Sequence, residues 1–503
     1  MKQLLLLGGF LLALSTTGQA QLRGVCGTPP LDAAEVARVQ ANKRYLRDHG
    51  LPTQRDVTYY GIAFHLIGEN DGSGRADVSD VLDMLCYIND EFAEMDVQFF
   101  AKTFNYIDNT GAYNTPKNSG SLLNFNRDPN ALNMYIANKA DSGNSGPGTT
   151  LAYYDPQRDW VVTRIQEVND EENTLAHEIG HFFSLPHPHR GWDSEPYNEN
   201  DHGNPVQATS PGQVPTELQD GSNCETAGDM ICDTPPDYNF GFGWPDCNFT
   251  DDIMDPSGEI VVPEERLHMG YFLNCEPLDE YFFSPMQKDL MLADMASPER
   301  AYIDTDHTPF EGEFDAPVLT SPAAAALVEG YNSVELQWDA VDGADMYLLR
   351  VSPVLTLNNS TNRIVYGTSR VIDDLDPGDV YYWQVKPLDG TRVCHDVTSE
   401  IRSFTTGTTV ATAEVAELRD WSVAPNPAAP GTELRVQLEA RAAFTADVSL
   451  VDLTGRAVLT QPTTTIGSGA HSLRVATDNL TPGVYFLTIR SNNGISRRRV
   501  VLQ

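Results

Sequence analysis

The sequence predicts an α/β domain followed by two all-β sandwich domains. Between residues 57 and 163, short apolar runs typical of strands alternate with a segment of helical spacing. Beyond residue 317 the helical spacing disappears, and apolar and polar residues alternate as they do in the strands of a sandwich. The length of 503 residues agrees with about three domains.

The α/β domain is expected to begin with a strand at residues 57–67. Apolar residues at helical spacing follow over 81–95, and the apolar run 97–104 predicts the next strand. Shorter apolar runs at 132–136 and 160–163 predict two further strands. Because strand and helix signals alternate, we expect a sheet covered by helices.

The first 20 residues have the pattern of a secretory signal peptide, with basic Lys2, an apolar run and small residues at the exit. The apolar run spans about 11 residues, whereas a membrane-spanning helix needs about 20. No later stretch is long and apolar enough, so we expect an exported chain without a transmembrane segment. The expected divisions are a signal peptide 1–20, a pro-segment 21–56 with a helix over 31–49, the α/β domain 57–300, a linker 301–316, a β-sandwich 317–405, a linker 406–418 and a second β-sandwich 419–503.

Charge and cysteine content narrow the class of protein. The net charge is −38, from 71 acidic and 33 basic residues. Nucleic acid is therefore excluded as a partner, because phosphate binding needs clustered Lys and Arg. Export permits disulfides among the seven cysteines, and the odd count leaves one thiol for another use. The cysteines are Cys26, Cys86, Cys224, Cys232, Cys247, Cys275 and Cys394.

One stretch has the spacing of a catalytic zinc site. His177 and His181 are four residues apart, so on a helix they lie on one face and can reach the same metal ion. Glu178 lies between them, where it can polarise a metal-bound water as general base. Pro186 breaks the helix, which lets His187 turn back as third ligand. Three imidazoles leave a fourth position open for water, and His189 is a competing ligand close by.

The same stretch resembles the metzincin signature, and the residues around it resemble the pappalysin or cytophagalysin branch of these zinc peptidases. The resemblance covers about residues 57–295 and implies a metzincin-like domain, with a twisted mixed sheet and an active-site helix. Ser184 stands where the family has Gly, which allows a sharp turn of positive φ. Residues 253–255 resemble the Met-turn, which implies that Met254 lies under the metal. Pro256 then occupies the position where the family often has a Tyr.

Two further features follow from the resemblance. Residues 224–236 match a calcium-binding segment of relatives, which implies Ca²⁺ at Asp229, Asp233 and Thr234, although Asp233 could instead cap a turn. The resemblance also implies disulfides from Cys224 to Cys247 and from Cys232 to Cys275.

Cys26 has two roles open to it. Its thiolate could bind the zinc and displace the water as a cysteine switch, as pro-segments of the resembled family do. The other role is a disulfide with Cys86 or Cys394. The affinity of thiolate for zinc favours the switch.

The two β regions resemble known modules. Trp338 and the strand after Pro377 and Gly378 resemble a fibronectin type III domain, which implies a spacer or a substrate-binding module. The last region resembles the C-terminal sorting domain of the type IX secretion system of Bacteroidetes-type bacteria. This resemblance implies the secretion machinery as a partner, and a protein that is secreted or attached to the outer cell surface. The motifs that carry it are residues 424–427, 452–456, 480–485 and 497–501.

The sequence therefore predicts a secreted zinc-dependent endopeptidase acting on extracellular proteins, with Glu178 as general base and His177, His181 and His187 as zinc ligands. Two alternatives remain open. The first is a non-catalytic, zinc-containing protein of the cell surface that binds partners or mediates adhesion. The second is a zinc hydrolase of non-peptide bonds, which would use the same site.

Overall fold

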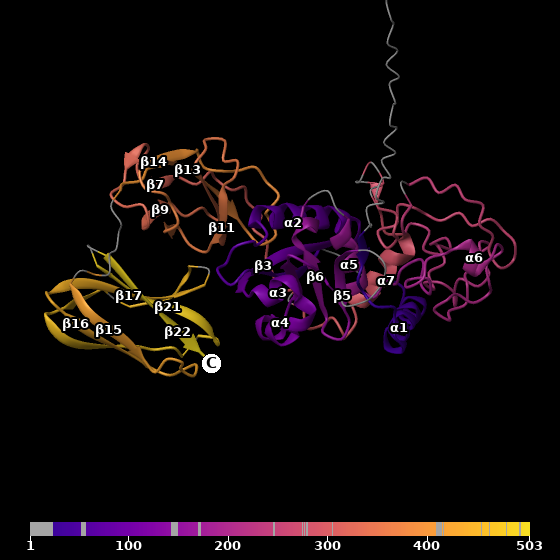
Figure 1. The fold of residues 1–503 in the computed structure, drawn as a ribbon, viewed down its shortest axis with the longest axis horizontal. Helices are drawn as coiled ribbons and strands as arrows, with labels where there is room; N and C mark the ends of the chain where they lie inside the picture. Colours follow the sequence, from indigo (N-terminus) through magenta and orange to yellow (C-terminus); the bar gives the residue numbers. More distant parts are fainter. Residues whose placement is uncertain are drawn as a thin grey trace, which may run out of the picture.

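A six-stranded mixed sheet forms the centre of the N-terminal part of the chain in the computed structural model (Figure 1). The structure describes residues 24–51, 57–141, 149–169, 173–244, 247–273, 275, 277, 280–303, 305–408, 415, 417–453, 455–461, 463–478, 480–491 and 494–503. The predicted signal peptide, 1–20, lies outside these residues. Among the described helices, none combines the length and the apolar character needed to cross a bilayer.

The strand order of the sheet is β1-β5-β6-β4-β2-β3. β2, β3, β4 and β6 run parallel, whereas β5 is antiparallel to β6 and pairs in parallel with β1 at the edge. The four parallel strands β2, β3, β4 and β6 were predicted from their apolar runs, whereas β1 at the edge and β5 beside it were not predicted from the sequence. The strands are β1 (Gly24–Cys26), β2 (Thr58–Gly68), β3 (Val97–Asp108), β4 (Leu132–Ala137), β5 (Thr149–Asp155) and β6 (Trp160–Arg164).

Helices cover both faces of the sheet, which explains why its central strands are mainly apolar on both sides. Phe64, Leu66 and Met134 face the side covered by α2 and α5. Ile67 and Tyr135, their neighbours along the strands, face the opposite side, where α3 and α4 pack. The helices are α1 (Ala33–His49), α2 (Val78–Phe92), α3 (Thr110–Asn114), α4 (Gly120–Asn126), α5 (Thr174–Phe182), α6 (Glu199–His202) and α7 (Pro285–Met295).

Two β-sandwiches follow, and Figure 1 places them beside each other at one end of the molecule. Each consists of two sheets with its own apolar core. The middle sandwich contains β7 (Leu319–Ser321), β8 (Ala326–Leu327), β9 (Val334–Trp338), β10 (Met346–Ser352), β11 (Thr361–Val365), β12 (Ser369–Ile372), β13 (Val380–Leu388) and β14 (Arg402–Thr405). The C-terminal sandwich contains β15 (Leu418–Ala424), β16 (Leu434–Ala440), β17 (Phe444–Asp452), β18 (Ala457–Thr460), β19 (Thr464–Ile466), β20 (Gly469–Val475), β21 (Gly483–Ser491) and β22 (Gly494–Leu502).

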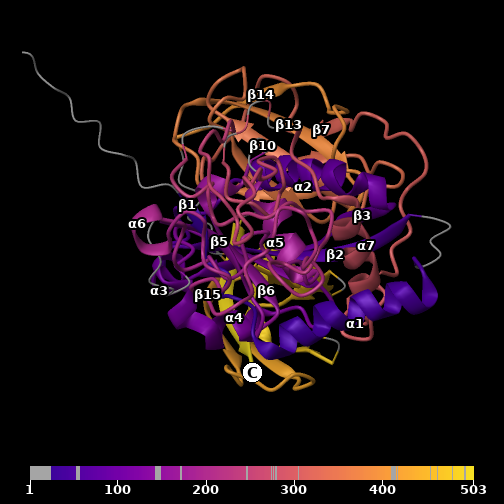
Figure 2. The same ribbon diagram turned by 90° about the vertical axis from the view of Figure 1, so that its right-hand side faces the viewer.

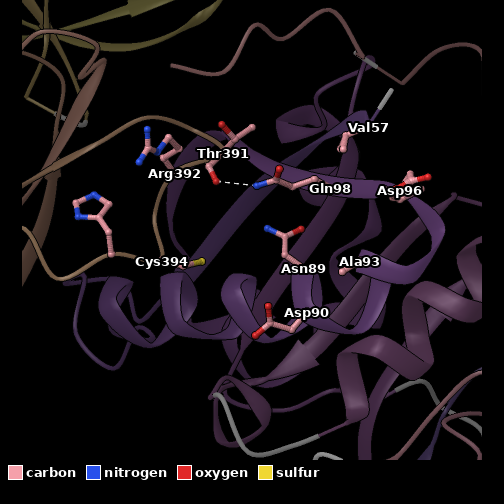
Figure 3. A pocket seen from close by; sticks show the side chains of 11 residues that line it. Val57, Asn89, Asp90, Ala93, Asp96, Gln98, Thr391, Arg392 and Cys394 are labelled. Carbon is pink, nitrogen blue, oxygen red and sulfur yellow. Dashed lines mark hydrogen bonds between the residues drawn. The ribbon is translucent and has the colours of Figure 1, made fainter. Parts of the chain in front are cut away.

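The middle sandwich is joined to the α/β part by a disulfide between Cys86 on α2 and Cys394, with Cα atoms 5.6 Å apart. The Gln98 amide donates a hydrogen bond to the Thr391 carbonyl at 2.9 Å across this junction (Figure 3). A cavity of about 380 Å³ lies here between the two parts, and the residues that line it do not belong to the predicted zinc site. A covalent bond and a shared core attach this sandwich directly to the helix-covered sheet.

A long segment between α5 and α7 contains little regular structure besides α6. Its aromatic side chains form a separate small core, and two disulfides close it. The predicted pairing was wrong, because Cys224 is bonded to Cys232 and Cys247 to Cys275. The two bonds join cysteines 8 and 28 residues apart, whose Cα atoms lie 5.1 and 5.2 Å from each other.

The disulfide between Cys86 and Cys394 is expected to hold the middle sandwich against α2. Replacing both cysteines by Ser should destabilise the junction by about 2–5 kcal/mol. Hydrogen exchange should then become faster in α2 and β13, while the C-terminal sandwich keeps its protection. The double replacement Cys224→Ser/Cys232→Ser is the matched control. Unchanged exchange in α2 would contradict this role.

Candidate metal centre

Helix α5 supplies two of the predicted ligands, His177 and His181. All nine of its residues are buried, because the helix lies against the sheet with Ile179 and Phe182 in the main core. Thr174 at the start of the helix donates its hydroxyl to the Glu167 carboxylate at 2.8 Å, which fixes the first turn of the helix.

The chain turns sharply after α5, as the break at Pro186 predicted. Ser184 has φ 72°, the left-handed conformation for which glycine is favoured. The Leu185 amide donates to the Gly180 carbonyl at 2.9 Å, and this bond closes the turn. The Ser184 hydroxyl donates to Asp294 at 2.6 Å, a contact that glycine could not make. Serine is therefore accommodated here, and His187 is directed back towards the helix.

The three predicted histidines converge through their Nε2 atoms. The Nε2 of His187 lies 3.2 Å from that of His177 and 2.9 Å from that of His181. All three rings are buried. Burial, and then the neighbouring His187, hold the pKa values of His177 and His181 well below the usual range of imidazole. The His177 and His181 rings are therefore neutral.

The outer nitrogen of each ring is committed to an acceptor. Nδ1 of His177 donates to the His268 carbonyl at 2.6 Å, and Nδ1 of His181 donates to the Leu185 carbonyl at 2.7 Å. Nδ1 of His187 donates to the Asp193 carboxylate at 2.7 Å. Each ring thus carries its proton on the outside, and three Nε2 lone pairs face one another. Such a set fits a zinc-type cation, because without one the lone pairs would repel.

A methionine packs beneath this helix, but it is Met269 and not Met254. A Cβ added to Gly180 would lie 2.5 Å from the Met269 sulfur, so a glycine is required where the methionine meets the helix. Met254 lies elsewhere, where its backbone pairs with Ile260 and its N–H donates to Asn204 at 2.8 Å. The prediction for Met254 was wrong because the buried Asp255 builds a tight turn around residues 255–259.

Tyr271 follows Met269 by two residues and lies against the histidines. Its ring centroid is 5.0 Å from that of His187 and 6.2 Å from that of His177. Tyr271 thus follows the methionine beneath the helix at the spacing at which the resembled family often has a tyrosine. It was not predicted from the sequence, although the Met-x-Tyr spacing of Met269 and Tyr271 could have revealed it.

Glu178 is fully buried beside the converging histidines. Its Oε2 accepts a hydrogen bond from the Thr28 hydroxyl at 2.9 Å. Burial raises the pKa of Glu178 to about 7. A carboxyl group with such a pKa can take up and release a proton near neutral pH.

Cys26 lies at the end of β1, and its sulfur closes the site. Its Sγ and the ligand nitrogens of His177, His181 and His187 all lie within 4.8 Å of one another. Cys26 is not in a disulfide, and Cys86 and Cys394 are bonded to each other, so the alternative disulfide for Cys26 is contradicted. The Thr28 amide donates to its Sγ at 3.3 Å. The structure thus brings the thiol to the fourth side of the histidine set.

The three residues predicted for calcium do not converge on one point. Asp233 accepts from the Ser284 hydroxyl at 2.7 Å and the Met286 amide at 2.8 Å, so it caps the start of α7, the other role that the sequence left open. The Thr234 hydroxyl donates to Asp229 at 2.8 Å. Asp229 instead faces Glu217, which was not predicted. Burial, and then Asp229, raise the pKa of Glu217.

Comparisons with known proteins identify the family of the C-terminal region. Residues 422–503 match the family described as secretion system C-terminal sorting domain. No curated protein matches the chain in sequence. A solved promirolysin mutant of Tannerella forsythia is 13% identical, covers 54% of this chain and 92% of its own, and gives a TM-score of 0.33.

Fibronectin type III domains are also among the similar structures. The FN1–FN3 domains of chicken CNTN1 are 13% identical, cover 38% of this chain and 69% of their own, and give a TM-score of 0.16. The fn3 domain of the human collagen α-1(XX) chain is 29% identical, covers 20% of this chain and 93% of its own, and gives a TM-score of 0.15. The firm assignment is therefore that residues 422–503 are a type IX secretion sorting domain, and that the chain is secreted or attached to the outer surface of a Bacteroidetes-type bacterium.

Proposed function

We propose that this chain is a secreted zinc-dependent endopeptidase of the metzincin type, made as a latent precursor. The observation that carries the proposal is the convergence of three imidazoles through Nε2, next to a buried glutamate. Zinc held by His177, His181 and His187 would polarise a water molecule and the scissile carbonyl as a Lewis acid. This donor set, with one side left for water or substrate, is that of a catalytic zinc site.

Glu178 is the general base and acid of the proposed reaction. Glu178 follows the proposed ligand His177 on the same helix. The Glu178 carboxylate can therefore reach the water position without binding the metal. Glu178 takes the proton of the attacking water and then passes it to the leaving amine. Its pKa of about 7 suits both transfers. The Tyr271 hydroxyl, released from its 3.2 Å bond to the Cys26 carbonyl, can donate to the oxyanion.

The segment around Cys26 keeps the precursor inactive in two ways. The Cys26 thiolate takes the position that water would occupy among the histidines. Two residues later, the Thr28 hydroxyl bonds to Glu178 and holds the base. A single short segment therefore blocks both the metal position and the proton acceptor.

The same segment occupies the edge on which substrate is expected. β1 pairs in parallel with β5, whose other neighbour is β6. When β1 leaves, the unpaired edge of β5 lies beside α5 and can accept an extended peptide as an added strand. This geometry favours a peptide over a small ester or amide, since main-chain pairing needs a polypeptide.

A calcium ion is proposed at Glu217 and Asp229 rather than at the three residues first predicted. Both carboxylates are buried, the pKa of Glu217 is raised by this burial and then by the charge of Asp229, and Glu217 Oε2 has no hydrogen-bond partner among the described residues. Two buried carboxylates that interact in this way are stabilised by a proton or a cation between them. Oxygen donors of this kind suit Ca²⁺.

Replacing Glu178 by Gln should abolish cleavage of a denatured protein such as gelatin while zinc is kept. The loss expected for removing a general base is on the order of 10²–10⁴-fold in kcat. Both proteins should carry about one zinc per chain, measured by elemental analysis after activation. Zinc in both but cleavage by neither would contradict the peptidase and favour the cell-surface binding protein.

Replacing Cys26 by Ser should make the full secreted chain active without removal of the pro-segment, because a hydroxyl is a much weaker zinc ligand than a thiolate. The measurement is the lag before gelatin cleavage begins. Arg47→Ala is the matched control, since Arg47 is exposed on the same pro-segment. An unchanged lag in the Cys26 variant would refute the thiolate latch.

Calcium should raise the unfolding temperature of the chain, by roughly 2–4 °C for each kcal/mol of binding free energy. Glu217→Gln should remove most of this increase, because it removes one of the two carboxylates. The control is Asp220→Asn, an exposed acidic residue three positions away. The unfolding temperatures are measured by scanning calorimetry. Equal calcium effects in the unaltered protein and in both variants would exclude the site.

A further inference from the structure

An arginine of helix α1, which lies in the predicted pro-segment, binds the body of the protein through Asp294. Arg38 donates from Nε to Asp294 Oδ1 at 2.6 Å and from its terminal nitrogen to Oδ2 at 2.7 Å. Asn42, one turn further along, adds a bond of 2.9 Å to the same carboxylate. Figures 1 and 2 both place α1 beside α7, which carries Asp294. This is the two-pronged geometry that a guanidinium makes with a carboxylate.

Asp294 is fixed from the opposite side by the body of the protein. Ser184 donates to Oδ1 at 2.6 Å, and Arg300 donates to Oδ2 at 3.1 Å. Arg300 is itself bonded to Asp159 at 2.7 Å and to the carbonyl of Phe182 at the end of α5. The carboxylate therefore keeps its place when α1 leaves, while it loses the three donors supplied by Arg38 and Asn42.

A cavity connects this carboxylate with the metal centre. It has a volume of about 480 Å³ and lies between α1 and the body. Its body side runs from His181, one of the converging histidines, to Ser184, which touches Asp294. The acidic Glu299 lies along the same cavity. Removal of the pro-segment turns the cavity into an open groove that leads away from the metal and ends at a negative charge.

We propose that this end of the groove is a substrate subsite selective for arginine, and that Arg38 occupies it in the precursor. The proposal rests on the peptidase function proposed above and adds a substrate class to it. The subsite lies beyond Ser184, one turn past His181, so it takes a residue two or more positions from the bond that is cleaved. Lysine fits less well, because a point charge cannot make both bonds to Asp294.

The test uses the full chain with its pro-segment removed by limited proteolysis. Peptides that carry arginine at one position are compared with peptides carrying citrulline there, which has the same shape without the charge. Each position within four residues of the scissile bond is examined. We expect about tenfold or higher kcat/KM for arginine at one position that is not adjacent to the scissile bond. Equal rates at all positions, or a preference only beside the scissile bond, would overturn the proposal.

Binding to activated Glu178→Gln protein separates this proposal from the peptidase function. The arginine peptide should bind about tenfold more tightly than the citrulline peptide, measured by fluorescence anisotropy. Tighter binding without cleavage of any peptide by the unaltered protein would contradict the peptidase and support the subsite. Equal binding of both peptides would overturn the subsite.

The charge of Asp294 can be tested in the protein as well. Asp294→Asn should reduce the preference for arginine over citrulline to near unity, whereas Asp289→Asn on the same helix should leave it unchanged. Since Asp294 also contacts Arg300, the paired peptides on the unaltered protein decide the question if the variant fails to fold. A preserved preference in folded Asp294→Asn would overturn the assignment.

Discussion

Three imidazole lone pairs that point at one another constrain the rest of the N-terminal part of the chain. Lone pairs at 2.9–3.2 Å repel unless a cation lies between them, so every surrounding contact must hold them in place. The Nδ1 atoms are bonded to two carbonyls and one carboxylate, and these acceptors come from three separate segments. The helix, the turn at Ser184 and the irregular segment before α7 are therefore built around one point.

The proposed latency and the proposed arginine recognition depend on the same neighbourhood. Cys26 reaches the histidines and Thr28 reaches Glu178 because β1 extends the sheet at β5. A dozen residues further on, Arg38 binds Asp294, which also holds the turn at Ser184. The pro-segment thus contacts the metal position, the base and the turn that carries His187. The buried network around Arg300 keeps the turn in place after the segment has left.

The convergence of His177, His181 and His187 was predicted from the sequence, because helical geometry places residues i and i+4 on one face and Pro186 indicated a break in the helix before His187. The parallel strands were predicted because burial on both faces makes them mainly apolar. The methionine beneath the helix was predicted to be Met254 because residues 253–255 resemble the Met-turn. Such a short motif does not indicate which methionine packs beneath Gly180. The pairing of Cys86 with Cys394 could not be predicted either, since it joins residues 308 positions apart through the docking of two domains. The partnership of Glu217 with Asp229 is likewise a tertiary contact.

The most direct test is X-ray absorption at the zinc edge on the full-length precursor. We expect about one zinc per chain with three nitrogen ligands near 2.0–2.1 Å and one sulfur ligand near 2.3 Å, roughly the distances typical of imidazole and thiolate. In the Cys26→Ser protein the sulfur signal should be replaced by oxygen while the three nitrogens remain. A precursor that binds no zinc, or binds it without histidine nitrogen, would contradict the metal centre on which the proposed function depends.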